Sequence, residues 1–300
     1  MGVDERPLAF FNYCVCFLDL LGQRAALHNQ GLLPSVDSEQ GRKELIATLL
    51  KGTGPIIELR KYAEDMRSKY VQEHPNSPAR AQLPHELRAS WDEIQNTKVK
   101  MQSWSDGIVL YVCLGDESVK CKMNGIFGML GIAGSICLDF LGMGIPVRGA
   151  IEVGWGVEVQ DGDISGAAVA RAYELDSVVA QYPRIVVGPI ALNLIQSRAG
   201  TTAAGDDIYS QADQGMAKLC VQMLVKDVDG HCAVHYLGEE FQLYVDGGKR
   251  DPLVYTKAYA YIIDQLSEHR RTQDTKLAFR YSQLLQYFDA HRSRAYVPTS

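Results

Sequence analysis

The sequence predicts an α+β fold, and three observations support this prediction. Strand-like and helix-like segments alternate along the chain, instead of falling into separate halves. Two strand-like runs flank the dipeptide Asp106-Gly107, which favours a hairpin and hence antiparallel pairing. The 300 residues are 46% hydrophobic, which is enough for one large core or two modest ones.

The first predicted strand covers residues 10–19. It is rich in aromatic and β-branched residues and apolar on both faces, which is typical of a central strand. Its last residue, Asp19, is a candidate N-cap for a helix that begins near Leu20 and Leu21.

Residues 41–72 carry a helical pattern that the break at 52–55 is expected to split or kink. Residues 73–96 are polar and contain three prolines, so we expect a mobile loop there. The hairpin follows over residues 97–114, with Asp106-Gly107 in a type I′ turn.

A glycine-rich apolar stretch, residues 125–138, lies in a predicted helix at about 119–142. The stretch is too short to cross a bilayer, because Asp139 closes it and Lys120 and Lys122 open it. We expect a buried helix that packs on a sheet or at a subunit interface, and a membrane span is the less favoured alternative.

A strand at 146–154 completes the order β-α-β-β-α-β, the ferredoxin-like arrangement in which two helices cover one face of an antiparallel sheet. The later predicted elements are a helix at 165–180, a strand at 184–187, a helix near 189–197, a strand around 232–237 and helical structure over 254–290. We expect one catalytic-type domain over 1–250, with an insertion at about 30–95, and a helical C-terminal tail over 251–300 that packs on it.

Charge and cysteine content limit the possible functions. The net charge of −6 and the pI of about 5.7 argue against a nucleic-acid binder. The seven cysteines are odd in number and show no paired CxxC spacing, so neither a disulfide framework nor a zinc site is expected. No secretion signal is recognisable, and we expect a cytoplasmic protein without a membrane span.

Asp19 and Asp106 are the main candidates for chemistry. Taken by itself, Asp19 is more readily interpreted as a helix N-cap, and Asp106 as an ordinary residue of an Asp-Gly turn. In the predicted sheet, however, the end of the first strand and the tip of the hairpin fall at the same edge, where two carboxylates can share two divalent cations. The main-chain carbonyl of Leu20 could add an oxygen ligand. The N–H groups expected to face a triphosphate at the helix start are those of Leu20, Leu21, Gly22 and Gln23.

At this point the sequence resembles a known family, the class III nucleotidyl cyclases. The segment from Phe17 to Gly22 resembles their opening motif, and Ser105-Asp106 falls where they have a second metal-binding aspartate. Residues 148–154 and 166–176 are similar to a later strand and helix start, so the resemblance covers roughly residues 10–190. It implies two Mn²⁺ or Mg²⁺ ions on Asp19, Asp106 and the Leu20 carbonyl. The nucleotide contacts that it implies are Phe17, Leu20, Leu21, Gly22, Gln102 and Asp163.

Within that family, the chain is most similar to the bacterial pyrimidine cyclases of the anti-phage system Pycsar. The shared features are the Ser-Asp hairpin, the Arg-Gly-x-Ile strand, the Ala-Tyr-x-Leu-Asp helix and the Pro-Arg-Ile-Val strand at 183–186. This resemblance implies a manganese-dependent homodimer, with the active site at its interface, that makes cyclic UMP or cyclic CMP. A separate effector would respond to the product.

The base-reading positions depart from the adenylyl cyclases. Those enzymes have a lysine four residues before the second aspartate, where this chain has Gln102, and its expected partner is Asp163. A Gln/Asp pair both donates and accepts hydrogen bonds without reproducing the adenine-reading pair. This argues against ATP and is compatible with UTP, our first choice, or CTP; the sequence does not separate the two.

The positions that stabilise the transition state also depart from the family. Its asparagine maps to Ala170 and its arginine to Glu174, and neither can do the same work. Arg171 is the nearest cation and is predicted to reach the phosphates, although an exposed helix arginine is an equal alternative. Arg148 is expected to order a strand end or pair with an acid, and Arg184 is a weaker phosphate candidate.

For three other sites, the sequence allows both a structural and a functional role. Lys249-Arg250 could reach a triphosphate across a dimer, but a solvated turn is favoured. Tyr62 and Tyr70 could contact a uracil, but packing is favoured. For the whole chain, the alternatives to a pyrimidine cyclase are a cyclase-like nucleotide-binding module without activity and a relative of the two-metal polymerase palm.

Overall fold

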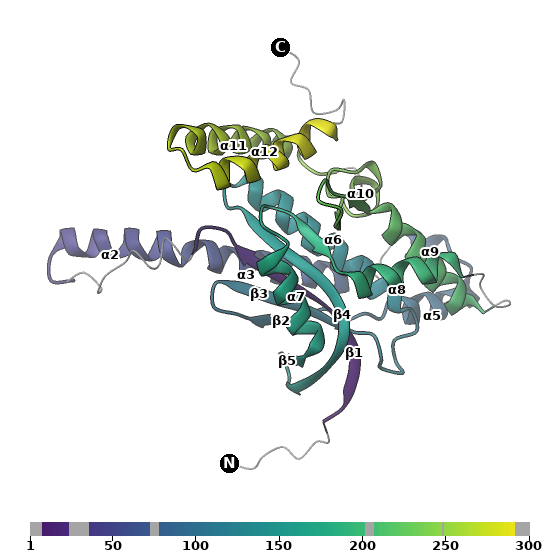
Figure 1. Cartoon of the computed structure of the whole chain (residues 1–300). Helices are drawn as coiled ribbons and strands as arrows, with labels where there is room; N and C mark the ends of the chain where they lie inside the picture. Colours follow the sequence, from purple (N-terminus) through teal and green to yellow (C-terminus); the bar gives the residue numbers. More distant parts are fainter. Residues whose placement is uncertain (1–7, 24–35, 73–77, 202–206, 248, 292–300) are drawn as a thin grey trace.

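The protein has a mixed α/β fold built on one eight-stranded sheet with helices on both faces (Figure 1). The computed structural model describes residues 8–23, 36–72, 78–201, 207–247 and 249–291. The strand order is β2-β3-β1-β4-β6-β8-β7, and β5 pairs with β4 outside this path. The α+β class predicted from the sequence is therefore confirmed at this level.

The strand β1 (Phe10–Leu20) lies in the middle of the sheet, as predicted. It pairs antiparallel with β3 (Gly107–Cys113) on one side and with β4 (Val147–Gln160) on the other. The strand β2 (Lys100–Ser103) pairs with β3, which confirms the predicted hairpin.

The alternation of side chains along β1 gives the sheet two different faces. Cys14, Cys16 and Leu18 belong to the large core under α3 and α6. Val15 and Phe17 point the other way, into a smaller apolar cluster with α7. Both faces of β1 are thus covered, which explains its almost continuous apolar sequence.

Most of the described residues between β1 and β2 are helical. The helices are α2 (Glu39–Gly52), α3 (Gly54–Gln72), α4 (Pro78–Gln82) and α5 (His85–Ile94). The predicted split near residue 53 is confirmed. The mobile loop expected over 73–96 is wrong where the structure describes it, because α4 and α5 occupy most of that stretch; residues 73–77 lie outside the described part. The polar composition arises because α5 exposes most of its side chains.

The glycine-rich helix α6 (Lys122–Gly142) crosses the large core. Among the described helices, it alone is long and apolar enough to span a membrane, and 83% of its most apolar stretch is buried inside the protein. It is therefore a buried core helix that packs on the sheet, which confirms the favoured alternative.

The second half of the chain extends the sheet and adds helices around it. In order, its elements are β5 (Asp163–Gly166), α7 (Ala167–Val178), β6 (Ile185–Val187), α8 (Pro189–Gly200), α9 (Ile208–Gln222), β7 (Leu224–Lys226), β8 (Cys232–Val234) and α10 (Glu239–Tyr244). The sequence patterns missed β5, α9, β7 and α10. Three of these are short, so their periodicity is weak.

Two antiparallel helices, α11 (Pro252–Arg271) and α12 (Thr275–Ala290), form the C-terminal layer (Figure 1). The residues that α11 buries are Tyr255, Ala258, Ile262 and Leu266. This spacing by three and four produces one apolar stripe, which joins the large core beside α6.

Candidate functional site

Asp19 and Asp106 lie at the same edge of the sheet, as the sequence predicts. Asp19 is the second-last residue of β1 and is in register with Gly107, the first residue of β3. Asp106 immediately precedes Gly107, in the connection between β2 and β3. Adjacent strands therefore deliver both carboxylates to one place, from positions 87 residues apart in the chain (106 − 19).

Arg148 stands opposite Asp19 on the other side of β1. The two residues are in register between β1 and β4. The Nη2 and Nε atoms of Arg148 donate to Oδ2 of Asp19 over 2.9 and 3.2 Å. This agrees with the expectation that Arg148 pairs with an acid.

A third carboxylate, Asp176, reaches the same place from α7. Its Oδ1 atom lies 3.5 Å from Nε of Arg148, and its side chain is 2% exposed. Burial raises the pKa of Asp176 to about 7; Arg148 opposes this shift, and the nearby charges of Asp19 and Asp106 add to it. Asp19 and Asp176 thus share one guanidinium, and Asp106 lies near enough to Asp176 to influence its pKa.

Asp176 is the residue of this candidate site that the sequence patterns did not indicate. The buried positions of α7 are Ala168, Val169, Ala172 and Asp176. A carboxylate in line with alanines four and eight residues earlier sits on the buried face of the helix, where an unpaired charge is costly. Its place on the buried face of α7 could have indicated from the sequence that Asp176 pairs with a cation inside the protein.

The turn at Asp106-Gly107 is not of type I′, contrary to the prediction. A type I′ turn needs positive φ at both central residues, and neither residue has one. Gly107 already belongs to β3, and a Cβ there would lie 2.3 Å from the carbonyl oxygen of Leu18. The glycine is required by the close approach of β1, not by the turn.

The segment after Asp19 also differs from the prediction. β1 continues through Leu20, so Asp19 is a strand residue and not a helix N-cap. The N–H of Leu21 donates to the carbonyl of Pro146 over 2.9 Å, so it is not available to a triphosphate. Gly22 adopts a positive φ of 83° in the turn, and Gln23 is the first helical residue. The rest of the predicted helix lies outside the described residues.

Phe17 is buried beside the aspartates and contacts two aromatic rings that are partly exposed. It lies two residues before Asp19 on the same face of β1. Its ring meets Trp104 and Tyr173 edge-to-face, with centroids 5.9 and 5.3 Å apart. Trp104 and Tyr173 are 41% and 47% exposed, so this cluster lies at the surface.

Gln102 and Asp163 come together, although they are 61 residues apart. The Nε2 of Gln102 donates to Oδ1 of Asp163 over 2.8 Å, and its Oε1 accepts from the N–H of Ile164 over 3.1 Å. This pair joins β2 to β5. Gln102 lies in register with Val109 and so faces the same side as Phe17 and Asp19.

Arg171, which is predicted to reach the phosphates, lies far from both aspartates of its own chain. It is exposed in the first half of α7. Its Nη1 is close to Gly154, because a Cβ added to that glycine would lie 3.4 Å from it. Gly154 is in register with Tyr13, six residues before Asp19 on β1. That separation is roughly 20 Å at about 3.3 Å per residue.

The other predicted cations are held in the fold. Arg184 is ion-paired with Asp227 and Asp229, at 2.6 and 2.5 Å, so its assignment to phosphate is wrong. Arg250 is not in a solvated turn, because it is buried and paired with Asp139 and Asp246.

The favoured packing role of Tyr62 is confirmed. Its ring packs on Phe140 with centroids 5.6 Å apart, and its hydroxyl donates to Asp139. The side chain of Tyr70 lies outside the described residues.

The donor chemistry of the edge fits hard cations. Asp19 and Asp106 offer carboxylate oxygens, and the guanidinium of Arg148 shows that a positive charge is already stabilised there. In the described part of the chain, no three His, Cys, Asp or Glu side chains converge closely enough to form a metal site by themselves. The edge therefore provides two carboxylates, and the remaining ligands of a bound cation would have to be phosphate oxygens of the triphosphate.

No family model matches this chain, and neither does any curated protein.

Proposed function

We propose that this protein is a metal-dependent nucleotidyl cyclase. Its substrate would be a pyrimidine nucleoside triphosphate, UTP first and CTP as the alternative, and its products the 3′,5′-cyclic monophosphate and pyrophosphate. The observation that carries the proposal is the meeting of Asp19 and Asp106 at one sheet edge, in the register of β1 with β3.

The topology supports this assignment. The strands β4-β1-β3-β2 form an antiparallel run, with α3 and α6 in the core on one face. This is the arrangement expected for the ferredoxin-like core of a class III cyclase. The aspartates belong to the opposite face, beside α7.

Two Mn²⁺ or Mg²⁺ ions would be held by Asp19, Asp106 and the Leu20 carbonyl. When bound, they supply Lewis-acid chemistry that lowers the pKa of the ribose 3′-hydroxyl and balances charge on the α-phosphate. The carboxylates of this chain position the reacting groups, and Arg148 and Asp176 hold Asp19 in place.

The reaction needs no covalent enzyme intermediate. The ribose 3′-oxygen forms a bond to the α-phosphorus, the bond from that phosphorus to the bridging oxygen of the β-phosphate breaks, and pyrophosphate leaves. The hydroxyl proton passes to Asp19, to water or to a substrate phosphate. Catalysis then rests on positioning and on charge stabilisation.

The substrate assignment rests on Gln102 and Asp163. Their hydrogen bond lies on the same face of the sheet as Asp19 and presents an amide next to a carboxylate. A pyrimidine ring offers matching donors and acceptors. The Phe17–Trp104–Tyr173 cluster provides aromatic surface nearby.

Arg171 fits this proposal only in a homodimer with the active site at its interface. It is exposed, and it lies far from the aspartates of its own chain. A second protomer would then supply it to the phosphates. The family resemblance implies further that the cyclic product signals phage infection to a separate effector, and the scattered cysteines favour a reducing cytoplasm.

A second candidate is a cyclase-like module that binds a nucleotide without turning it over. The observation that favours it is the exposed pair Ala170 and Glu174, which replaces the transition-state residues of the family. It predicts metal-dependent binding of a triphosphate and no cyclic product.

The deciding experiment incubates the purified protein with each of the four nucleoside triphosphates and Mn²⁺ and identifies products by mass spectrometry. We expect cyclic UMP, and loss of at least about 99% of turnover in Asp106→Asn, because removing one charge from a two-metal site disables it. Asp264→Asn, an exposed change on α11, is the matched control.

Binding of Mn²⁺, followed by electron paramagnetic resonance, provides a readout that does not depend on turnover. It should weaken in Asp106→Asn and stay unchanged in Asp264→Asn. Full turnover by Asp106→Asn would overturn the two-metal proposal. A linear oligonucleotide product would favour the polymerase-palm alternative instead.

A further inference from the structure

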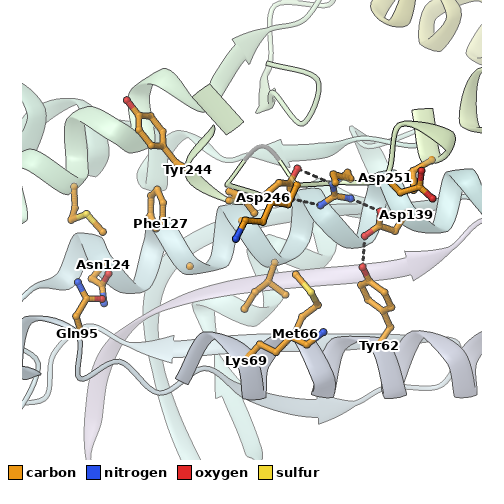
Figure 2. Close-up of a pocket in the computed structure, with 18 of the residues that line it drawn as sticks. Tyr62, Met66, Lys69, Gln95, Asn124, Phe127, Asp139, Tyr244, Asp246 and Asp251 are labelled. Atoms are coloured by element: carbon orange, nitrogen blue, oxygen red, sulfur yellow. Dashed lines mark hydrogen bonds and ion pairs between the residues drawn. The ribbon is translucent and has the colours of Figure 1, made fainter. Parts of the chain in front are cut away.

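A cavity of about 710 Å³ lies beside α6 (Figure 2). α6 packs on the face of the sheet opposite to the one that carries Phe17 and Asp19. The floor of the cavity is α6, one wall is α3, and the other wall is formed by Val245, Asp246 and residues 249–251. The volume lies in the range of small-molecule sites. None of the residues assigned above to the cyclase reaction lines it.

The cavity follows most of the length of α6. Along α6 it extends from Asn124 to Asp139, which corresponds to roughly 22 Å at about 1.5 Å per residue. Gly128 lines it from α6 without a side chain, and Val245 packs over Gly131, where an added Cβ would lie 3.3 Å from its Cγ2. An elongated ligand fits this shape better than a compact ring system.

The lining is apolar and adaptable over most of its length. Met66 enters from α3 and Met216 from α9, and Phe127 and Ile132 belong to α6. Thioether side chains adjust to flexible apolar ligands because they have several accessible rotamers. The body of the ligand is therefore aliphatic.

Arg250 fixes the far wall and neutralises its acids. Its guanidinium donates to both carboxylate oxygens of Asp246, over 2.7 and 2.8 Å, and to Oγ of Ser135 over 2.7 Å. It also pairs with Asp139, which accepts from Tyr62 (Figure 2). Arg250 thus neutralises Asp139 and Asp246. The third acid of the lining, Asp251, caps α11, where its Oδ1 accepts from the N–H of Leu253 over 2.9 Å.

Two lysines remain to interact with a ligand at the rim. Lys249 is exposed and makes no ion pair with any residue that the structure describes. Lys69 is paired with Asp65 over 2.7 Å, in a surface contact of the kind that exchanges readily with solvent and other anions. The charge complement of the cavity is therefore an anionic head group.

From these observations we propose that this cavity binds an unbranched aliphatic acid. The chain of the acid lies along α6, and its carboxylate is held at the rim by Lys249 and Lys69. The site does not depend on the proposed cyclase activity, because it shares no residue with it.

The test is a fluorescence titration of the full chain with dansyl-labelled undecanoate, followed by competition. We expect saturable one-to-one binding that dodecanoate displaces and that dodecylamine and dodecanol displace poorly. The combined charge reversal Lys69→Glu and Lys249→Glu should weaken binding about tenfold, since both cations face the head group. The double reversal Lys257→Glu and Lys276→Glu, at exposed positions on α11 and α12, is the charge-matched control and should bind normally.

Three further arms make the outcome decisive. Met66→Trp should also weaken binding, because the indole fills the middle of the cavity, whereas Asp19→Asn should bind like the unmodified chain even if it lacks cyclase activity. Absence of saturable binding, equal competition by the amine, or an unchanged affinity in the double reversal would each overturn the proposal. If the probe binds only after dilution has dissociated a dimer, the cavity is covered by a second copy of the chain, and this result would overturn the proposal as well.

Discussion

At the scale of single residues, Arg148 determines the charge balance of the sheet edge. It is the one described cation that pairs with both Asp19 and Asp176, and its side chain is 18% exposed. Without it, two carboxylates would share a partly desolvated space with a third, Asp106. Like charges in such a space destabilise one another strongly.

We therefore expect Arg148→Met to lower the free energy of unfolding by about 3–5 kcal/mol, the usual cost of leaving a buried charge without its partner. The combined change Arg148→Met and Asp176→Leu should recover most of this loss, because it removes the stranded charge as well. Urea unfolding at neutral pH measures both. A single variant within about 1 kcal/mol of the parent would contradict the assigned pairing.

At the scale of elements, the contact of β1 with its neighbours depends on two glycines. A Cβ on Gly107 would lie 2.3 Å from the carbonyl oxygen of Leu18, and one on Gly149 would lie 2.4 Å from that of Phe17. Both obstacles are backbone atoms, which cannot rotate away. The end of β1 that carries Asp19 is therefore closely packed between the backbones of β3 and β4, and we call this arrangement the clamp.

Gly107→Ala should destabilise the protein by about 2–3 kcal/mol, because β1 and β3 must separate to admit the methyl group. Gly215→Ala is the matched control. This glycine lies inside α9 with nothing within 4 Å of the added Cβ, so the change should be stabilising by up to about 1 kcal/mol. Thermal unfolding of the two variants gives the comparison, and equal melting temperatures would refute the clamp.

At the scale of the whole molecule, a half-buried histidine docks the C-terminal helices on the sheet. His235 follows β8, and its Nδ1 lies 3.0 Å from the hydroxyl of Tyr287 on α12. Burial lowers the pKa of His235 to about 4; the neighbouring His291 adds to this shift and Glu240 opposes it. The pKa of His291 is lowered too, by burial.

This arrangement predicts a pH-dependent stability. The unfolded chain takes up a proton on His235 below about pH 6.5, whereas the folded chain does so only near pH 4. Stability is complete above that window and declines as the pH falls through it, by up to about 3 kcal/mol for this group. In His235→Gln, unfolding measured between pH 7 and pH 4 should show a smaller decline, and an unchanged slope would contradict the assignment.

The proposed homodimer can be tested by complementation. If Arg171 acts on the phosphates of the partner's site, Asp19→Ala and Arg171→Ala should each be inactive alone. A mixture of the two, refolded or co-expressed, should recover about a quarter of the parent activity, because half of the dimers are mixed and each has one intact site. Full activity of Arg171→Ala alone would remove this residue from the mechanism.

Much of the fold could be predicted because its long elements carry strong patterns. β1 is apolar on both faces, which indicated a buried central strand. The glycine-rich apolar run of α6 indicated a buried helix in the same way. Short elements such as β7, with three residues, lack enough periods to be recognised. The polar segment around α5 misled because a surface helix buries little and so reads like a loop.

The sequence by itself determined which residues are available for chemistry: Asp19 at the end of a central strand, Asp106 after a short strand, and the Gln102 and Asp163 positions. Only the tertiary structure decided how they are used. Register placed Arg148 opposite Asp19, and the buried face of α7 brought Asp176 to the same guanidinium. The distance along β1 separated Arg171 from both aspartates. Local pattern records the period of an element, whereas pairing across a sheet depends on strand order and offset, which no single segment encodes.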